Sequence, residues 1–188
     1  MVLPANIKPV IWGIAPVNMA GWALCGFYLA LMPSLSAGIM ASEAAWQDGL
    51  LIFLLPFVGG IAAVTLRHRQ AVTNVRVSCI SMIIGLSMIV LGAWWHQAVW
   101  LLLGGIASGV GFGAGFLGTK KAMLARAPAS QRSGVIALFY LLSYLPFSLP
   151  VILAGMGSQY AGLTSTTVGF SLLLGALCLW VLYRSRTS

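Results

Sequence analysis

Six long apolar stretches occupy most of this chain, and they constrain its fold more than any other feature of the sequence. The expected membrane spans are residues 10–32, 50–66, 77–95, 98–118, 134–155 and 168–183. At about 1.5 Å per residue, roughly 20 residues of helix cross the hydrocarbon core of a bilayer. The stretches show no period-two alternation, which excludes a transmembrane β-barrel. We therefore predict an all-α membrane protein in which residues 1–188 form one domain of six transmembrane helices.

The Lys and Arg residues predict how these helices are oriented. They precede the first span, lie between the second and third and between the fourth and fifth, and follow the sixth. The ten residues are Lys8, Arg67, Arg69, Arg76, Lys120, Lys121, Arg126, Arg132, Arg184 and Arg186. Because positively charged loops are retained on the cytoplasmic side during insertion, we expect both termini in the cytoplasm. The expected location is the cell (inner) membrane.

The gaps between spans predict two longer loops and one tight turn. Residues 33–49 hold Glu43 and Asp48 and are expected to form an acidic outer loop. Residues 119–133 are expected to form the longest inner loop, which is basic. Only His96 and Gln97 separate the third and fourth spans, so these two helices are predicted to form a tight antiparallel hairpin.

The composition excludes a water-soluble fold and a nucleic-acid-binding role. Hydrophobic residues make up 60% of the chain and charged residues only 6%, whereas soluble domains carry about 25% charged residues. The formal charge of +8 lies in short loops rather than along one recognition face, which argues against nucleic acid. Anionic lipid of the cytoplasmic leaflet is the expected partner of these cations, each of which contributes about 1 kcal/mol near such a surface.

The cysteines and histidines indicate neither a disulfide framework nor a metal site. Cys25, Cys79 and Cys178 all lie inside apolar stretches, where free cysteine behaves as a small buried hydrophobe. His68 and His96 both lie outside the spans and have no neighbours in the sequence that suit a metal or a catalytic centre. We therefore predict no metal, no cofactor and no enzymatic activity.

An intramembrane serine protease is one enzyme class that a six-helix chain could represent. Such enzymes need a membrane-embedded serine and a histidine on another span. Ser108 follows Gly105 by one residue too many for a Gly-x-Ser-Gly motif, and both histidines are outside the spans. The sequence therefore argues against this class.

Glycine is concentrated in the fourth span. Gly105, Gly109 and Gly113 are four residues apart and form one smooth stripe on a helix, while Gly111 and Gly115 form a second. Without side chains, a neighbouring backbone can approach closely, which favours tight packing between membrane helices. A smooth face also suits a helix that rocks or lines a passage, and the two interpretations are compatible. A nucleotide-binding glycine loop is excluded because no strand precedes the run.

A few polar side chains inside the spans are candidates for a substrate pathway. An unsatisfied amide in lipid costs several kcal/mol, so Asn18 must face another helix or a wet cavity. Tyr140 and Tyr144 are four residues apart on one helix face, which Ser148 continues. These residues either contact a substrate or hydrogen-bond between helices. No Asp, Glu, Lys or Arg lies within a span, which argues against a self-contained proton-driven pump.

The second and fifth spans show a weak internal similarity. Both are interrupted by proline and glycine, at Pro56, Gly59 and Gly60 in one and at Pro146, Pro150 and Gly155 in the other. Two triplets of helices, each with a broken middle member, are typical of a three-plus-three inverted repeat.

Three segments resemble the C-terminal half of bacterial major facilitator superfamily transporters. Residues 21–35 are similar to the seventh helix of that family, residues 105–116 to its tenth, and residues 132–155 to its tenth-to-eleventh connection and eleventh helix. The resemblance implies a half of the family's fold, with the first and fourth helices lining a cavity and the second and fifth meeting the other half. The inner motif that follows the second helix in the family is incomplete here, because residues 60–69 contain no acidic member.

The resemblance also assigns expected roles to individual residues. It implies that Asn18, Tyr28, Ser108 and Phe112 lie near the passage, and that Tyr140 and Tyr144 lie on the face between halves. The expected function is transport of a small molecule across the membrane by alternating access. The alternative is a truncated or split transporter fragment that acts only as an assembly subunit, paired with a separate N-terminal half or with a second copy of itself.

Overall fold

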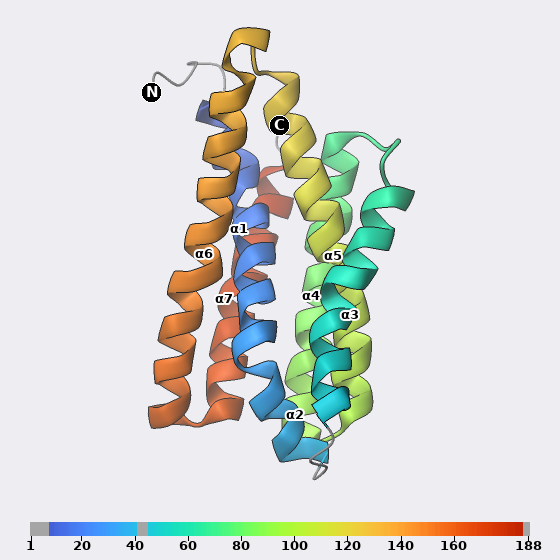
Figure 1. Cartoon of the computed structure of the whole chain (residues 1–188), viewed down its shortest axis with the longest axis vertical. Coiled ribbons are helices and arrows are strands. Elements are labelled where there is room, and N and C mark those ends of the chain that lie inside the picture. The colour runs from blue at the N-terminus through green and yellow to red at the C-terminus, as the bar shows by residue number, and fades with distance from the viewer. Residues whose placement is uncertain (1–7, 41–44, 186–188) are drawn as a thin grey trace.

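The computed structural model describes residues 8–40 and 45–185, and within these ranges it contains helices and no strands (Figure 1). The α-helices are α1 (Lys8–Ala30), α2 (Met32–Met40), α3 (Ala45–Thr65), α4 (Ala71–Trp95), α5 (Ala98–Ala125), α6 (Arg132–Ala161) and α7 (Leu163–Arg184). All of them except α2 are long and apolar enough to cross a membrane. For the described residues, the prediction of an all-α fold with six helices long and apolar enough to span a membrane is therefore confirmed.

Several helices extend beyond the apolar stretches that predicted them. α3 begins at Ala45 rather than at residue 50, α4 begins at Ala71 rather than at 77, and α7 begins at Leu163 rather than at 168. α6 likewise runs from Arg132 to Ala161, which exceeds the predicted 134–155 at both ends. Hydropathy reports where side chains are apolar, but a helix continues into the polar headgroup region as long as no residue breaks it.

The expectation of a long inner loop over residues 119–133 is wrong. α5 continues to Ala125, and a single 3-10 turn, Ala129–Gln131, leads directly into α6. The helix ends shortly before Pro128, because a proline disfavours helical backbone in the residue before it and cannot donate a backbone hydrogen bond. The basic residues of this segment therefore lie largely on helix ends.

The connections that were expected on the outer side are also more helical than the sequence suggested. The segment 33–49 contains most of α2 and the start of α3, while Glu43 lies outside the described residues. A single residue, Gly162, joins α6 to α7, and its φ of 82° is a conformation that glycine adopts without strain. The predicted hairpin between the third and fourth spans is confirmed, since only His96 and Gln97 separate α4 from α5.

The six long helices form two groups that pack on each other (Figure 1). α1 packs against α6 and α7, whereas α5 packs against α3 and α4. The groups meet where α1 contacts α5 and where α4 contacts α7. Both groups therefore contain helices from the first and the second half of the chain.

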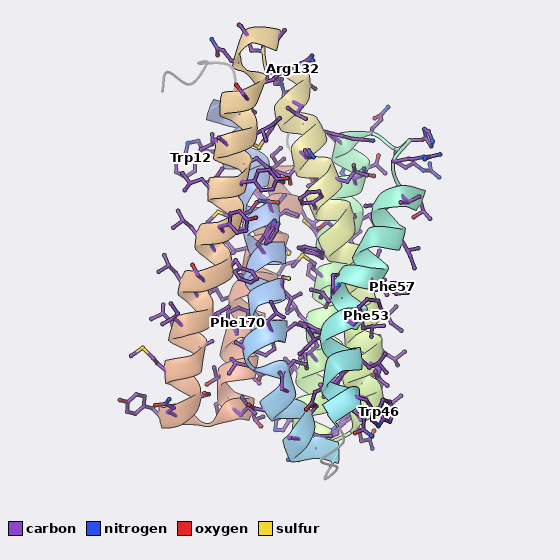
Figure 2. The ribbon with its side chains drawn as sticks, viewed as in Figure 1. Trp12, Trp46, Phe53, Phe57, Arg132 and Phe170 are labelled. Carbon is purple, nitrogen blue, oxygen red and sulfur yellow. The ribbon has the colours of Figure 1, made fainter. Side chains whose placement is uncertain are left out.

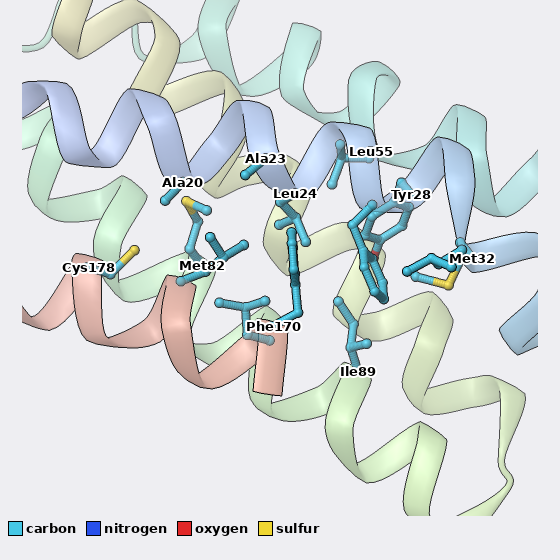
Figure 3. Close-up of a cluster of buried hydrophobic side chains, with 14 of the residues drawn as sticks. Ala20, Ala23, Leu24, Tyr28, Met32, Leu55, Met82, Ile89, Phe170 and Cys178 are labelled. Atoms are coloured by element: carbon cyan, nitrogen blue, oxygen red, sulfur yellow. The ribbon is translucent and has the colours of Figure 1, made fainter. Parts of the chain in front are cut away.

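The core lies between α1, α3, α4 and α7 (Figure 3). Leu24 and Tyr28 of α1 point into the same space as Met82 and Ile89 of α4 and Phe170 of α7. In addition, the ring of Phe27 stacks on that of Phe170 with centroids 5.0 Å apart. These contacts join the two groups of helices along the centre of the bundle.

The outer surface of the bundle is apolar and carries aromatic residues at both ends. Figure 2 shows Phe53 and Phe57 projecting outward from α3, and their rings are stacked with centroids 4.9 Å apart. Trp12 and Trp46 lie toward opposite ends of the bundle, and both are exposed. Exposed tryptophan near each end of a membrane helix bundle is typical of the two membrane interfaces.

The basic turns gather at one end of the bundle. Figure 1 shows the α3–α4 and α5–α6 connections at the same end as the start of α1 and the end of α7. The Lys121 Nζ donates hydrogen bonds to the carbonyl oxygens of Arg67 and Arg69, the latter at 3.0 Å. The Arg76 guanidinium donates to the Ser185 carbonyl at 2.8 Å. Arg186 lies outside the described residues.

The glycines of α5 form two packing surfaces. Gly105, Gly109 and Gly113 meet α3, where a Cβ atom on Gly109 would lie 2.9 Å from the Leu55 carbonyl oxygen. The glycines that meet α4 are Gly104, Gly111, Gly115 and Gly118. The structure therefore places the first stripe at a tight helix contact, where α3 and α5 touch through their backbones.

We predict that Gly113→Ala destabilises the protein, because its Cβ would overlap the backbone of Gly59. Forcing an extra carbon into a packed contact costs about 1–3 kcal/mol. Thermal unfolding in detergent should show a lower melting temperature for this variant. Gly60→Ala is the matched control, since a Cβ there meets nothing within 4 Å. Equal melting temperatures for the two variants would contradict the α3–α5 contact.

We also predict that oxidation cross-links Cys79 on α4 to Cys178 on α7. Both residues are buried in the core, and their side chains are neighbours across the α4–α7 contact. A specific protease site inserted between Arg126 and Gln131 would cut the chain between these cysteines. After oxidation and cleavage, the two fragments should migrate together in non-reducing electrophoresis. They should separate in the Cys178→Ser variant, and separation in the parent chain would contradict the packing.

Candidate functional site at the junction of α1, α5 and α6

Trp22 is the centre of an aromatic cluster formed by three helices. It lies on α1, and its ring centroid is 5.7 Å from that of Phe112 and 6.4 Å from that of Phe116, both on α5. On α6, the rings of Tyr144 and Phe147 lie 5.5 Å and 6.1 Å away. Two of these pairs are edge-to-face, an arrangement that aromatic quadrupoles favour.

The cluster continues along α6 toward the basic end of the bundle. The Tyr140 and Tyr144 rings are stacked with centroids 6.0 Å apart, and the Phe139 ring bridges Tyr140 and Phe116. The Lys120 Nζ lies 5.6 Å from the centroid of the Phe116 ring, a cation–π distance. Aromatic faces and one peripheral cation therefore line this junction.

Asn18 and Ser143 form a polar pair beside the cluster. The Asn18 Nδ2 donates to the Ser143 Oγ at 2.8 Å, and the Ser143 hydroxyl donates to the Phe139 carbonyl at 2.8 Å. Asn18 is only 2% exposed, yet its Oδ1 has no hydrogen-bond partner. The pair thus joins α1 to α6 and leaves one strong acceptor unsatisfied. A buried acceptor of this kind costs about 1–3 kcal/mol unless water or a ligand reaches it.

Tyr144 shows that this junction is open on one side. It is 57% exposed and lies near the middle of α6, as Asn18 does in α1. A phenolic hydroxyl favours a polar partner, and the centre of a bilayer offers none. The geometry therefore favours a wet or partnered face over one that is bathed in lipid tails.

Tyr28 and Ser108 lie away from this junction. Tyr28 is buried in the main core, and Ser108 is buried where α4 passes over α5 at Gly85. Their hydroxyl groups are neighbours across the α1–α5 contact, but neither makes a hydrogen bond. The structure brings together Asn18, Phe112, Tyr140 and Tyr144, and it leaves these two residues in the packed interior.

Sequence reasoning did not select Trp22, which organises the site. Trp22 follows Asn18 by four residues and so shares its helix face, and Ser143 lies between the two tyrosines. The first spacing was a usable signal, since residues i and i+4 are neighbours on a helix. The pairing of Asn18 with Ser143 joins residues 125 positions apart, and no local pattern reveals it.

The site contains no arrangement typical of metal binding. Among the described residues, no group of three His, Cys, Asp or Glu side chains is placed to hold a metal ion. His68 accepts a hydrogen bond from the neighbouring Arg67 on the surface, and His96 lies beside the Trp94 carbonyl at the α4–α5 turn. The described side chains at the junction make aromatic contacts, a cation–π contact and a hydrogen bond.

No protein-family model, curated protein or solved structure matches this chain. The properties of the site consequently rest on its own geometry.

We predict that water reaches Tyr144 but not Leu149. Both are 57% exposed, yet five residues of α-helix place them on faces about 140° apart. With Cys25, Cys79 and Cys178 replaced by serine or alanine, Tyr144→Cys and Leu149→Cys should be tested in sealed membranes. A membrane-impermeant thiol reagent should label the first and spare the second, because a thiol must ionise in water to react. Equal labelling would show that the junction is no wetter than the lipid-facing surface.

Proposed function

We propose that this chain is the six-helix unit of a membrane transporter that moves a small molecule by alternating access. In this proposal it corresponds to the C-terminal half of a major facilitator transporter. The junction of α1, α5 and α6 contacts the substrate. The protein lies in the cell (inner) membrane, with both termini in the cytoplasm. Asn18, Trp22 and Tyr144 are the residues that meet the substrate.

The observation that carries this proposal is the unsatisfied Asn18 Oδ1 beside an open aromatic face. The acceptor is buried near the middle of α1, where lipid cannot hydrogen-bond to it. Polar residues at that depth are expensive and mark substrate pathways more often than surface residues do. A ligand with a donor group and an aromatic or apolar body would satisfy the acceptor and pack on the Trp22 ring.

Two of the contacts between helices agree with an inverted repeat of three plus three helices. In such a repeat, α1 corresponds to α5, α3 to α6 and α4 to α7. Exchanging the members of each pair turns the α1–α6 contact into the α3–α5 contact. The same exchange turns the α1–α7 contact into the α4–α5 contact. Pro56 then corresponds to a member of the Pro146 and Pro150 pair, each inside a helix. Repeats related in this way place binding sites near the middle of the membrane.

A second candidate function is that of an assembly subunit, and one observation favours it. α3 and α6 have the smallest share of buried residues among the six long helices, 22% each. These are the helices that meet the other half in the major facilitator resemblance. A separate N-terminal half or a second copy of this chain would cover them and close the open side of the junction.

We predict that replacing both members of the polar pair, in Asn18→Leu with Ser143→Ala, strongly reduces substrate uptake but preserves the fold. Replacing two hydrogen-bonded partners by apolar groups is nearly neutral for stability. Uptake into liposomes should fall about tenfold or more, because the variant loses an interaction with the substrate that contributes about 1.4 kcal/mol. The substrate would first be identified by thermal-shift screening of the parent chain.

Ser158→Ala is the matched control, because the Ser158 hydroxyl lies near the far end of α6 and donates only to the Gly155 carbonyl of its own helix. A lower melting temperature with unchanged uptake in the double variant would contradict the proposal and leave the pair a purely structural role. Uptake that appears only after co-reconstitution with an N-terminal half would identify the chain as an assembly subunit.

A further inference from the structure

A second surface feature, separate from the aromatic junction, lies between α4 and α7. It is a groove of about 540 Å³. Its lining residues are Ile83, Leu86, Ser87, Val90 and Leu91 on α4, and Ser171, Leu172, Gly175, Ala176 and Leu179 on α7. No residue of the aromatic junction contributes to it, so it is a separate site.

The groove exists because small residues of α7 leave space beside α4. A Cβ atom built on Gly175 would meet nothing within 4 Å. The one exposed hydroxyl in the lining, that of Ser87, donates to the Ile83 carbonyl of its own helix at 2.9 Å. Apart from the largely buried Ser171 hydroxyl, the rest of the lining is apolar, which suits a hydrocarbon chain.

The basic end of the groove carries a cation in line with it. Arg76, Ile83, Ser87 and Val90 are spaced at i, i+7, i+11 and i+14, so they share one face of α4. The exposed Arg76 guanidinium donates to the Ser185 carbonyl at 2.8 Å, which holds it at the α4–α7 junction. Arg presents five donors in a planar fork that matches phosphate oxygens. Seven residues of rise place the start of the groove about 10 Å from this cation.

We propose that this groove binds one anionic phospholipid, with its phosphate at Arg76 and one acyl chain between α4 and α7. The exposed Tyr183 ring flanks the headgroup, since tyrosine prefers the membrane interface. Charge complementarity selects an anionic lipid over a zwitterionic one. The cation and the groove are about 10 Å apart. A free phosphate could contact only the cation, whereas a lipid can place its phosphate at the cation and its hydrocarbon chain in the groove.

Native mass spectrometry of the purified full chain tests the proposal, with phosphatidylglycerol and phosphatidylcholine as probes. The parent chain should retain phosphatidylglycerol about fivefold more than phosphatidylcholine. This ratio corresponds to the attraction between one cation and an anionic lipid. Arg76→Gln should remove this preference, whereas Arg69→Gln, which changes an exposed cation off the groove, should retain it. Gly175→Leu should lower the retention of both lipids by filling the trough. Gly169→Leu, at another glycine of α7 with open space, should not.

Three outcomes would overturn the proposal. Equal retention of the two lipids by the parent chain would show that charge does not select the ligand. Unchanged phosphatidylglycerol retention in Gly175→Leu would place the lipid elsewhere. A dimer that Gly175→Leu abolishes, with lipid retention unaffected, would identify a second copy as the occupant of the groove. Melting temperatures of all variants in detergent establish that each is folded.

Discussion

The close contact of α5 with α3 and α4 is the interaction on which the rest of this structure depends. In lipid there is no hydrophobic driving force between helices, so association relies on packing and hydrogen bonds. Glycines on two faces of α5 allow that packing at backbone distance. Because these two faces of α5 pack against α3 and α4, the rotation of α5 is set, and Phe112 and Phe116 are directed toward Trp22 of α1.

The molecule has two candidate binding surfaces that differ in chemistry. One is the junction of α1, α5 and α6, and the other is the groove between α4 and α7. The first combines an unsatisfied amide oxygen with tyrosine and tryptophan rings, whereas the second is an apolar trough with a cation at one end. The helices that separate them share the main core around Leu24 and Met82. A ligand at the first surface and a lipid at the second would therefore contact different helices of one packed unit.

Much of the fold follows from the sequence, whereas the site follows only in part. Long apolar runs and the short turn at His96 predicted six helices and their hairpin, because both signals are local. The helix ends were missed where hydropathy falls but no residue stops the helix, as in the continuation of α5 past Gly118 to Ala125. Asn18, Tyr140 and Tyr144 were selected for their cost or spacing and Phe112 through the family resemblance, but Trp22 was not selected.

The sequence by itself determined that this chain is helical, that six of its helices suit a membrane and that its cations gather in alternate connections. These properties depend on side-chain hydropathy and charge, which act without reference to distant residues. Only the tertiary structure decided that Asn18 meets Ser143 across 125 positions, that Tyr28 and Ser108 lie in the core, and that α4 and α7 enclose a groove. Those contacts depend on which helix faces approach one another, and that choice is made by the packing of the whole bundle.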